Sequence, residues 1–259
     1  HSDAQLVDQI VSAAPNNLPL ESASNDRGQG PTSQPIKHYY WDSRYGTWRF
    51  STRTRQLDGG TTGYDCIPNG MQLSKNSLTV GAVMDVPVYT GPGSVVMTSF
   101  SSWGPADDGR IKPDIVGNGY QLYSSYSTSD NSYAIGSGTS MSCPNVCGSL
   151  ALLQDYYKDT HGGTAMWAST LKSVAIHTAR ECGSNPGPDY IYGWGLLNTY
   201  AAYKLLNKDY LDESKGYIEQ FTLNQGQTIE IGYRVYASTP ELRATICWTD
   251  PAGTPPANS

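Results

Sequence analysis

The stretch with the clearest chemical potential is Gly136-Ser137-Gly138-Thr139-Ser140-Met141-Ser142-Cys143-Pro144. It joins a turn rich in glycine and serine to an apolar pattern with helical spacing, which consists of Val146, Leu150, Leu153 and Tyr157. This order predicts that Ser140 lies at a helix N-terminus, where unpaired backbone N–H groups and the helix dipole favour an oxygen that becomes an anion. Ser140 is therefore a candidate nucleophile whose own N–H can help to bind a tetrahedral oxyanion.

A plainer interpretation of this turn is an N-capping serine in front of an ordinary helix. Pro144 fits both interpretations, because we expect it in the first helical turn, where its missing N–H costs no hydrogen bond. An isolated Gly-x-Ser turn does not separate the two, so the neighbouring residues must decide.

The whole string is more specific than the turn. Gly138-Thr139-Ser140-Met141-Ser142-x-Pro144 resembles the nucleophile motif of the subtilisin-like serine peptidases (subtilases), with Ser140 in the nucleophile position. Four further segments resemble the same family in the same order, and together they cover most of residues 1–200. They are Leu78-Thr79-Val80-Gly81-Ala82-Val83, Phe100-Ser101-Ser102-Trp103-Gly104-Pro105, Asp107-Asp108-Gly109-Arg110-Ile111-Lys112-Pro113-Asp114, and Tyr192-Gly193-Trp194-Gly195-Leu196-Leu197-Asn198.

The resemblance also implies an oxyanion donor at the end of a short strand predicted over residues 18–23. In subtilases such a strand ends in an Ala-Gly-Asn-like turn whose Asn amide donates to the oxyanion, and Asn25 occupies that position. Ser24 replaces the usual glycine. Without the resemblance, an Asn at a strand end is an ordinary turn residue. The substrate contacts that the family pattern implies are Ser22, Ala23, Ser24 and Thr139.

A serine nucleophile of this kind needs a general base that a carboxylate orients. Subtilases place the Asp first, then a His in a His-Gly-Thr context, then the Asn and finally the Ser. Because Asn25 comes so early in this chain, we expect the Asp and His upstream of residue 1. None of the four histidines has the His-Gly-Thr context, and we predict structural or solvent-exposed roles for His1, His38, His161 and His177. Asp107-Asp108 and Asp114 are expected to form a turn and a strand start.

The elements that position these residues follow an α/β pattern. A capping box at Ser2-Asp3-Ala4-Gln5 starts an amphipathic helix, and residues 78–83 and 115–116 have the composition of buried parallel strands. Further helices are expected after Thr164 and after Asn198. We predict an α/β parallel-sheet, subtilisin-like fold, incomplete at its N-terminus, as a catalytic domain over residues 1–208.

The C-terminal part has a different pattern. Residues 217–223, 227–236 and 242–249 alternate with a period near two, which is typical of strands. They resemble the opening of the jelly-roll-like β-sandwich that follows the catalytic domain in some large subtilases. Three strands cannot close a sandwich, so we expect a partial all-β sandwich domain over residues 215–259, truncated at its C-terminus.

Residues 27–64 form an aromatic and basic insertion, with five Lys or Arg against one Asp over residues 37–55. Alternation around Asp42-Ser43-Arg44-Tyr45-Gly46 predicts a hairpin. It can be a substrate-facing loop, a sugar-binding edge or a patch for an anionic partner. The interpretation that we favour is a hairpin that covers the sheet.

Composition excludes several classes. The chain has 259 residues, of which 38% are hydrophobic, and a net charge of −6, so a packed core is expected and a nucleic-acid partner is not. No run of 18 apolar residues is present, so no membrane span is predicted. The chain lacks an initiator Met, so we do not expect His1 to be the natural start. We predict no cofactor and no metal site; structural calcium is common in the family, but no ligand cluster here has a suitable spacing.

The five cysteines form no C-x-x-C pair and no metal-ligand spacing, and their odd number leaves at least one thiol free. Cys143 and Cys147 lie one helical turn apart just after Ser140. We expect two small buried side chains at these positions.

Two functions from different classes follow. The resemblance implies a secreted, extracellular serine endopeptidase that forms an acyl-enzyme on Ser140, with a protein or peptide substrate. In that case the chain alone is an inactive fragment, whose partner is the missing N-terminal segment of the same protein. The alternative is a catalytically silent binding or structural module derived from a subtilase. An esterase with another base is a third possibility that the histidines do not support.

Overall fold

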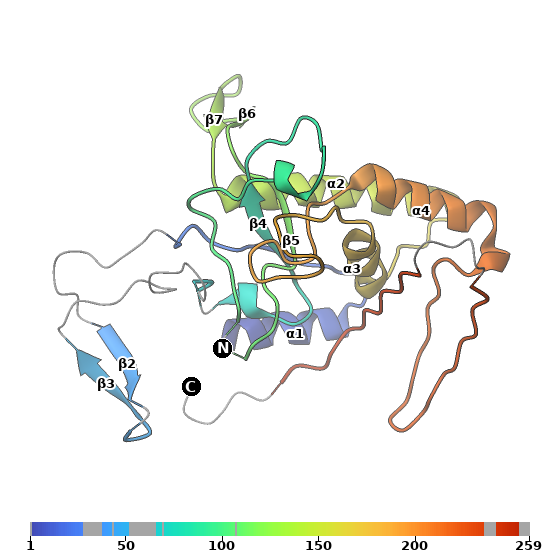
Figure 1. Cartoon of the computed structure of the whole chain (residues 1–259), viewed down its shortest axis with the longest axis horizontal. Helices are drawn as coiled ribbons and strands as arrows, with labels where there is room; N and C mark the ends of the chain where they lie inside the picture. The colour runs from blue at the N-terminus through green and yellow to red at the C-terminus, as the bar shows by residue number, and fades with distance from the viewer. Residues whose placement is uncertain are drawn as a thin grey trace.

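A three-stranded parallel sheet forms the centre of this computed structural model, which describes residues 2–27, 38–42, 44–51, 66–68, 70–106, 108–235 and 242–253. The strands β1 (Leu20–Ser22), β4 (Leu78–Val83) and β5 (Ile115–Asn118) lie in the order β1-β4-β5 (Figure 1). All six residues of β4 are buried, because this central strand is covered on both faces. The expected parallel α/β sheet is confirmed.

The described residues also form helices and two antiparallel hairpins. The α-helices are α1 (Ser2–Ala13), α2 (Thr139–Thr160), α3 (Ala168–His177) and α4 (Thr199–Leu211), and the 3₁₀ turns are η1 (Met71–Leu73), η2 (Pro92–Ser94) and η3 (Glu213–Lys215). The antiparallel hairpins are β2 (His38–Asp42) with β3 (Thr47–Ser51), and β6 (Leu122–Ser125) with β7 (Tyr133–Gly136). The hairpin expected around Asp42 is confirmed, but it lies apart from the sheet in Figure 1, contrary to the expectation that it covers the sheet.

The main core lies between the sheet and the long helix α2. Val146, Leu150 and Leu153, the predicted apolar stripe of α2, pack in one cluster with side chains of β4 and β5. Helices α3 and α4 complete the same cluster through side chains such as Val174 and Leu206. The stripe therefore fixes which face of α2 meets the sheet.

A buried ion cluster lies at the amino end of β5. The Asp114 carboxylate contacts the Lys112 ammonium at 2.6 Å and the Lys172 ammonium of α3 at 3.0 Å, and it accepts the Thr79 N–H at 2.7 Å. Burial lowers the pKa of Lys112 to about 8, although the Asp114 charge opposes this shift. Burial raises the pKa of Asp114, but the two ammonium groups outweigh it and the net pKa lies below its usual value. Asp114 is thus the shared counterion of two cations.

One helix boundary differs from the expectation. Helix α3 begins at Ala168, three residues later than a helix that starts directly after Thr164 would begin. The Asn16 side chain donates to the carbonyls of Ala165 and Met166, and the Ala168 N–H donates to the Pro15 carbonyl at 2.6 Å. These tertiary bonds hold the residues before α3 in place and delay the helix.

The predicted β-sandwich is not confirmed. The described residues among 217–235 and 242–253 contain no strand, and apolar side chains with strand-like alternation are exposed there, as at Ile229, Ile231 and Tyr233. A strand needs a partner for its backbone groups, and none of the described segments supplies one here. Residues 236–241 and 254–259 of the expected domain lie outside the described residues.

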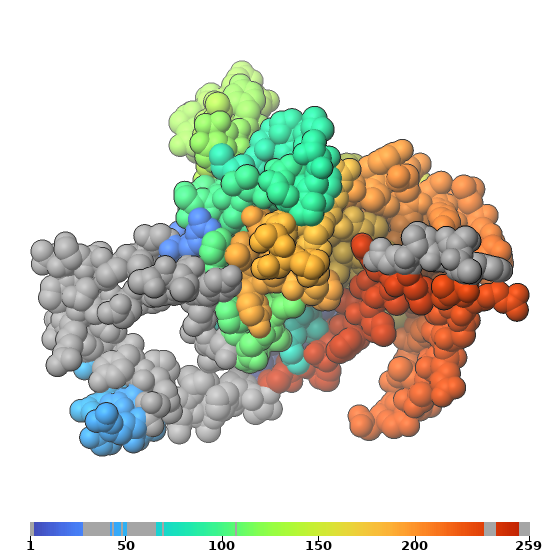
Figure 2. Space-filling model, in the orientation of Figure 1, coloured from blue at the N-terminus to red at the C-terminus, as the bar shows by residue number. Residues whose placement is uncertain are grey.

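The stretch 242–253 instead runs along the helical body as an extended segment (Figures 1 and 2). Asn76 and Asp250 exchange two hydrogen bonds, with the Asn76 amide donating at 2.8 Å and the Asp250 N–H donating at 2.9 Å. Gln5 of α1 donates to the Gly253 carbonyl at 2.8 Å, and Lys75 donates to the Pro251 carbonyl at 2.8 Å. The segment is therefore tied to α1 and to the loop before β4.

We predict that Asp114→Asn lowers the free energy of unfolding by about 3–5 kcal/mol, because it leaves two buried ammonium groups without their counterion. The matched control is Asp108→Asn, whose carboxylate pairs with Arg110 at 2.7 Å but is 58% exposed. That change should cost less than about 1 kcal/mol. Urea denaturation measures both, and equal effects of the two substitutions would contradict the role assigned to Asp114.

Candidate active site

The turn after β1 is tight and well anchored. Ser24 has a φ of 78°, in the left-handed region, so the serine adopts the conformation that a glycine would take at lower cost. Its hydroxyl donates to Asp26 at 2.5 Å, and its carbonyl accepts the Ser102 N–H at 2.9 Å. The Asp26 N–H in turn donates to the Ser102 hydroxyl at 3.0 Å. The replacement of glycine by Ser24 thus leaves the turn intact.

This turn brings Asn25 to the start of α2. The Asn25 Oδ1 atom accepts the Thr139 N–H at 3.0 Å and the Thr139 hydroxyl at 3.1 Å. The Nδ2 atom lies beside Gly138, where a Cβ added to the glycine would be 3.5 Å away. Gly138 has a φ of 154°, which favours glycine. The oxygen of the Asn25 amide therefore accepts hydrogen bonds from the first residue of α2. Its N–H₂ group lies beside Gly138, directly before the helix.

Ser140 is the second residue of α2, and its side chain is exposed. The N–H groups of Met141 and Ser142 donate to the Gly138 carbonyl at 3.0 and 3.2 Å. Among the described residues, nothing accepts the N–H of Ser140. An exposed hydroxyl thus lies beside a free backbone donor, at the positive end of a helix that runs to Thr160. The predicted position of Ser140 at a helix N-terminus is confirmed.

Pro144 does not lie in the first turn, and that expectation was wrong. The helix begins at Thr139, so Pro144 lies inside it, in the second turn. A proline at this position has no N–H for the carbonyl four residues earlier, which belongs to Ser140. The Ser140 carbonyl therefore lacks its usual intrahelical partner.

Ser142 is a supporting residue that sequence reasoning missed. Its buried hydroxyl donates to the Gly81 carbonyl of β4 at 2.8 Å and ties the first turns of α2 to the central strand. The signal was present in the sequence, since both residues lie in segments that resemble the family. Their contact joins two segments that are far apart in the chain, so the spacing of neither one predicts it.

The thiol of Cys143 does not compete with Ser140 as a nucleophile. Burial raises the pKa of Cys143 to about 11, so this thiol is protonated at neutral pH. Cys147 is exposed, contrary to the expectation of two buried side chains, because it lies outside the stripe of Val146 and Leu150. No disulfide joins the five cysteines, all of which lie in the described part of the chain.

Two histidines, His161 and His177, have described side chains, and both have partners other than Ser140. His161 ends α2 and stacks on Tyr157 with ring centroids 3.7 Å apart. It is 21 residues after Ser140, about 31 Å along the helix at 1.5 Å per residue. The His177 Nδ1 atom is 3.0 Å from the Thr245 hydroxyl. His38 is in β2, where its side chain lies outside the described residues, as does His1.

The four residues assigned to substrate binding differ in exposure. Ser22 and Ser24 are half-buried at the end of β1. Ala23 and Thr139 are fully buried, and the Thr139 N–H and hydroxyl are both engaged with Asn25. A substrate can therefore reach the side chains of the two serines more readily, and all four assignments stay predictions.

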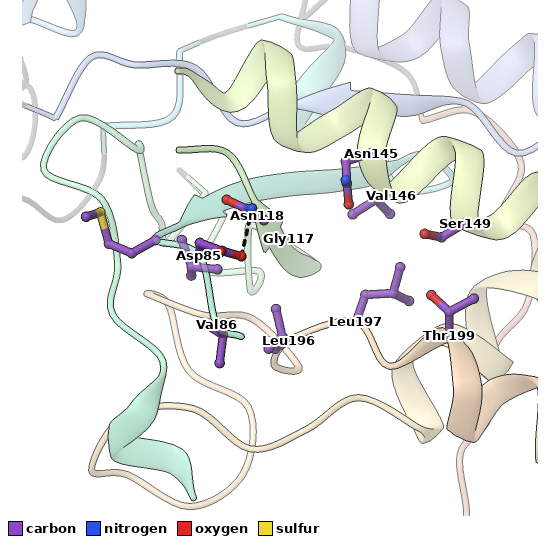
Figure 3. Close-up of a pocket in the computed structure, with 12 residues that line it drawn as sticks. Asp85, Val86, Gly117, Asn118, Asn145, Val146, Ser149, Leu196, Leu197 and Thr199 are labelled. Atoms are coloured by element: carbon purple, nitrogen blue, oxygen red, sulfur yellow. Dashed lines mark hydrogen bonds between the residues drawn. The ribbon is translucent and has the colours of Figure 1, made fainter. Parts of the chain in front are cut away.

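A separate pocket of about 200 Å³ lies at the carboxyl ends of β4 and β5, beside α2 (Figure 3). Its polar lining includes Asp85, Asn118, Asn145, Ser149 and Thr199, and the Asn118 amide donates to Asp85 at 3.1 Å. Neither Ser140 nor Asn25 lines it. In the part of the chain that the structure describes, no three His, Cys, Asp or Glu side chains group to hold a metal ion.

Comparison with known proteins identifies the family of this chain. The family model of the subtilases, described as the "Subtilase family", matches residues 2–195. The chain belongs to the subtilase family. It is 44% identical over 86 residues to the C5a peptidase of Streptococcus pyogenes serotype M3, an alignment that covers 33% of this chain and 7% of that protein. It is 31% identical over 137 residues to the subtilisin-like protease SBT4.3 of Arabidopsis thaliana, covering 44% and 18%.

Solved structures support the fold. A lanthipeptide protease is similar with a TM-score of 0.50 and 18% identity, covering 79% of this chain and 55% of that one. The self-cleaved protease domain of PatA gives the same four values. The chain spans less than a fifth of the length of the two sequence relatives described above and about half of these structures.

We predict that Asn25→Ala lowers the free energy of unfolding by about 1 kcal/mol, because it removes an acceptor for a helix N-terminus. Asn25→Asp should cost much less, since the carboxylate keeps the acceptor and places a negative charge near the positive end of α2. Thermal or urea unfolding of both variants tests this. An Asn25→Asp variant as unstable as Asn25→Ala would show that the tether to Thr139 does not stabilise the fold.

Proposed function

We propose that this chain supplies the nucleophile and the oxyanion site of a serine endopeptidase. One observation carries the proposal: the hydrogen bonds between Asn25 and Thr139 hold the Asn25 amide beside the helix N-terminus on which Ser140 is exposed. A side-chain donor and a backbone donor that converge beside a hydroxyl are what acyl transfer requires. Family membership adds support for proteolysis.

In the proposed mechanism, the Ser140 Oγ atom attacks the carbonyl carbon of a peptide bond while a histidine base takes its proton. The oxyanion that forms accepts hydrogen bonds from the Ser140 N–H and the Asn25 Nδ2 group. The intermediate collapses, the C–N bond breaks, and the protonated histidine gives its proton to the amine. Water then attacks the ester of Ser140 by the same steps and releases the acid.

The base and its carboxylate partner belong to the proposal as well. No His-Gly-Thr sequence occurs in residues 1–259, and His161 and His177 have other partners. We therefore propose that a preceding segment of the same protein supplies the Asp and the His. Such a segment has a place beside β1, which pairs with β4 and has no second partner strand among the described residues.

The proposed substrates are proteins or peptides, and the proposed site of action is outside the cell. The C5a peptidases among the relatives support a peptide substrate by their name. None of the described helices is long and apolar enough to cross a membrane.

In the full-length protein, we predict that Ser140→Ala abolishes peptide hydrolysis without unfolding the domain, because the side chain is exposed at a helix start. Asn25→Ala should lower kcat by about a hundredfold or more with little change in KM, since an oxyanion donor acts mainly in the transition state. His177→Ala is the matched control and should leave turnover unchanged. A fluorogenic peptide assay measures these rates. Full activity of Ser140→Ala would replace the enzyme with the silent binding module.

We also predict that residues 1–259 alone react slowly with a fluorophosphonate probe, because no base activates Ser140. Mass spectrometry after labelling locates the modified residue. Adding an upstream segment with Asp and His should accelerate the reaction at Ser140 by several orders of magnitude. Rapid labelling of residues 1–259 alone would show that another residue of this chain acts as the base.

A further inference from the structure

The hairpin formed by β6 and β7 projects from the body of the molecule directly before the nucleophile helix (Figures 1 and 2). Tyr123 pairs with Ile135, and Ser125 pairs with Tyr133. Since directly opposed residues share a face of a hairpin and every second residue of a strand does too, Tyr123, Tyr133 and Ile135 lie on one face. We call these three side chains the hairpin face.

The hairpin face is apolar and open to solvent. Tyr123 is 70% exposed, Tyr133 is 59% exposed and Ile135 is 66% exposed. The two tyrosine rings stack with centroids 5.4 Å apart and an interplanar angle of 23°. A stacked aromatic pair beside an isoleucine is an unusual surface to leave in water, because apolar side chains this large normally pack against a partner.

Hydrogen bonds give the hairpin a defined shape. At its tip, the Tyr126 N–H donates to the Ser132 carbonyl at 2.8 Å, and the Thr128 hydroxyl donates to the Ser132 hydroxyl at 2.7 Å. At its base, the Gln121 N–H donates to the Ser137 hydroxyl at 2.9 Å. The face is thus presented in one arrangement, which lowers the entropy lost when a ligand binds.

The hairpin is continuous with the proposed catalytic site. The Gly138 N–H donates to the Gly119 carbonyl at 2.8 Å, so both strands of the hairpin are held at the helix start. Ile135 is five residues before Ser140, and five extended residues span at most about 18 Å. An extended peptide that contacts the Ser140 hydroxyl therefore reaches the hairpin face within about five of its own residues.

We propose that the hairpin face binds the peptide substrate itself, through aromatic or aliphatic side chains that lie within about five residues of the scissile bond. This inference rests on the proposed function of Ser140. The chemistry of the hairpin favours an uncharged apolar segment, since Asp130 is the one Asp, Glu, Lys or Arg between Gly119 and Gly138. Stacking and apolar burial then select the substrate, while the oxyanion site performs the chemistry.

The test measures binding without hydrolysis. Residues 1–259 with Ser140→Ala are titrated with a fluorescein-labelled decapeptide that carries Phe at every second position, and with the same peptide carrying Ser instead. An extended peptide presents alternate side chains on one face, so several Phe residues can meet the hairpin together. Fluorescence anisotropy gives the Kd of each complex.

We expect Tyr123→Ala with Tyr133→Ala to weaken binding of the Phe peptide about tenfold and to leave the Ser peptide unchanged. Tyr123→Phe with Tyr133→Phe keeps both rings and should keep the affinity. Tyr200→Ala is the matched control, since Tyr200 is 68% exposed on α4. An unchanged Kd of the double alanine variant for the Phe peptide, with wild-type thermal stability, overturns the inference.

If the double alanine variant unfolds, Ile135→Lys replaces it, because it places a charge on the same face. An unchanged affinity of a folded Ile135→Lys variant for the Phe peptide again overturns the proposal. Hydrolysis by the full-length protein is a separate assay. Its absence rejects the catalytic role of Ser140, whereas a peptide preference that ignores the hairpin rejects only this inference.

Discussion

The hydrogen bonds from Thr139 to the Asn25 side chain are the constraint on which the proposed site depends. They join the end of an edge strand to the first residue of the longest helix, two elements separated by more than a hundred residues. One amide has two parts to play: its oxygen accepts hydrogen bonds from the first residue of α2, and its nitrogen lies beside Gly138, two residues before the exposed Ser140. The positions of the proposed oxyanion donor and of the proposed nucleophile therefore both depend on this contact.

The surrounding packing leaves this contact little freedom. A Cβ on Gly119 would lie 2.6 Å from the Ala82 side chain and 2.8 Å from the Gly138 carbonyl, so only glycine allows the chain to pass there. The Ser142 hydroxyl, bound to the Gly81 carbonyl, fixes the next turn of α2 to β4. The sheet, the start of α2 and the base of the β6–β7 hairpin thus meet at one point. Their packing produces the arrangement of Asn25 and Ser140 that the proposed acyl transfer needs.

Residues close together in the sequence predicted those features that depend on interactions between near neighbours in the chain. Helix α2 and its buried stripe, the parallel strands and the position of Ser140 followed from periodicity and turn chemistry. Several features that the sequence did not predict, or predicted wrongly, involve a partner that is distant in sequence. Gly138 and the tether to Asn25 start α2 early enough to place Pro144 in its second turn. The ion cluster of Asp114 needs Lys172 from another helix, and strands in residues 217–249 need partners that periodicity alone does not supply.

The attachment of residues 242–253 has a mechanical consequence. Tension applied from the C-terminal side of Gly253 is carried first by the bonds to Gln5, Lys75 and the paired Asn76 and Asp250. These bonds join the C-terminal stretch to α1 and to the loop before β4, so they lie outside the sheet. A pulling force would break these hydrogen bonds before it acted on β4. The arrangement of Asn25 and Ser140 would therefore stay unchanged while they break.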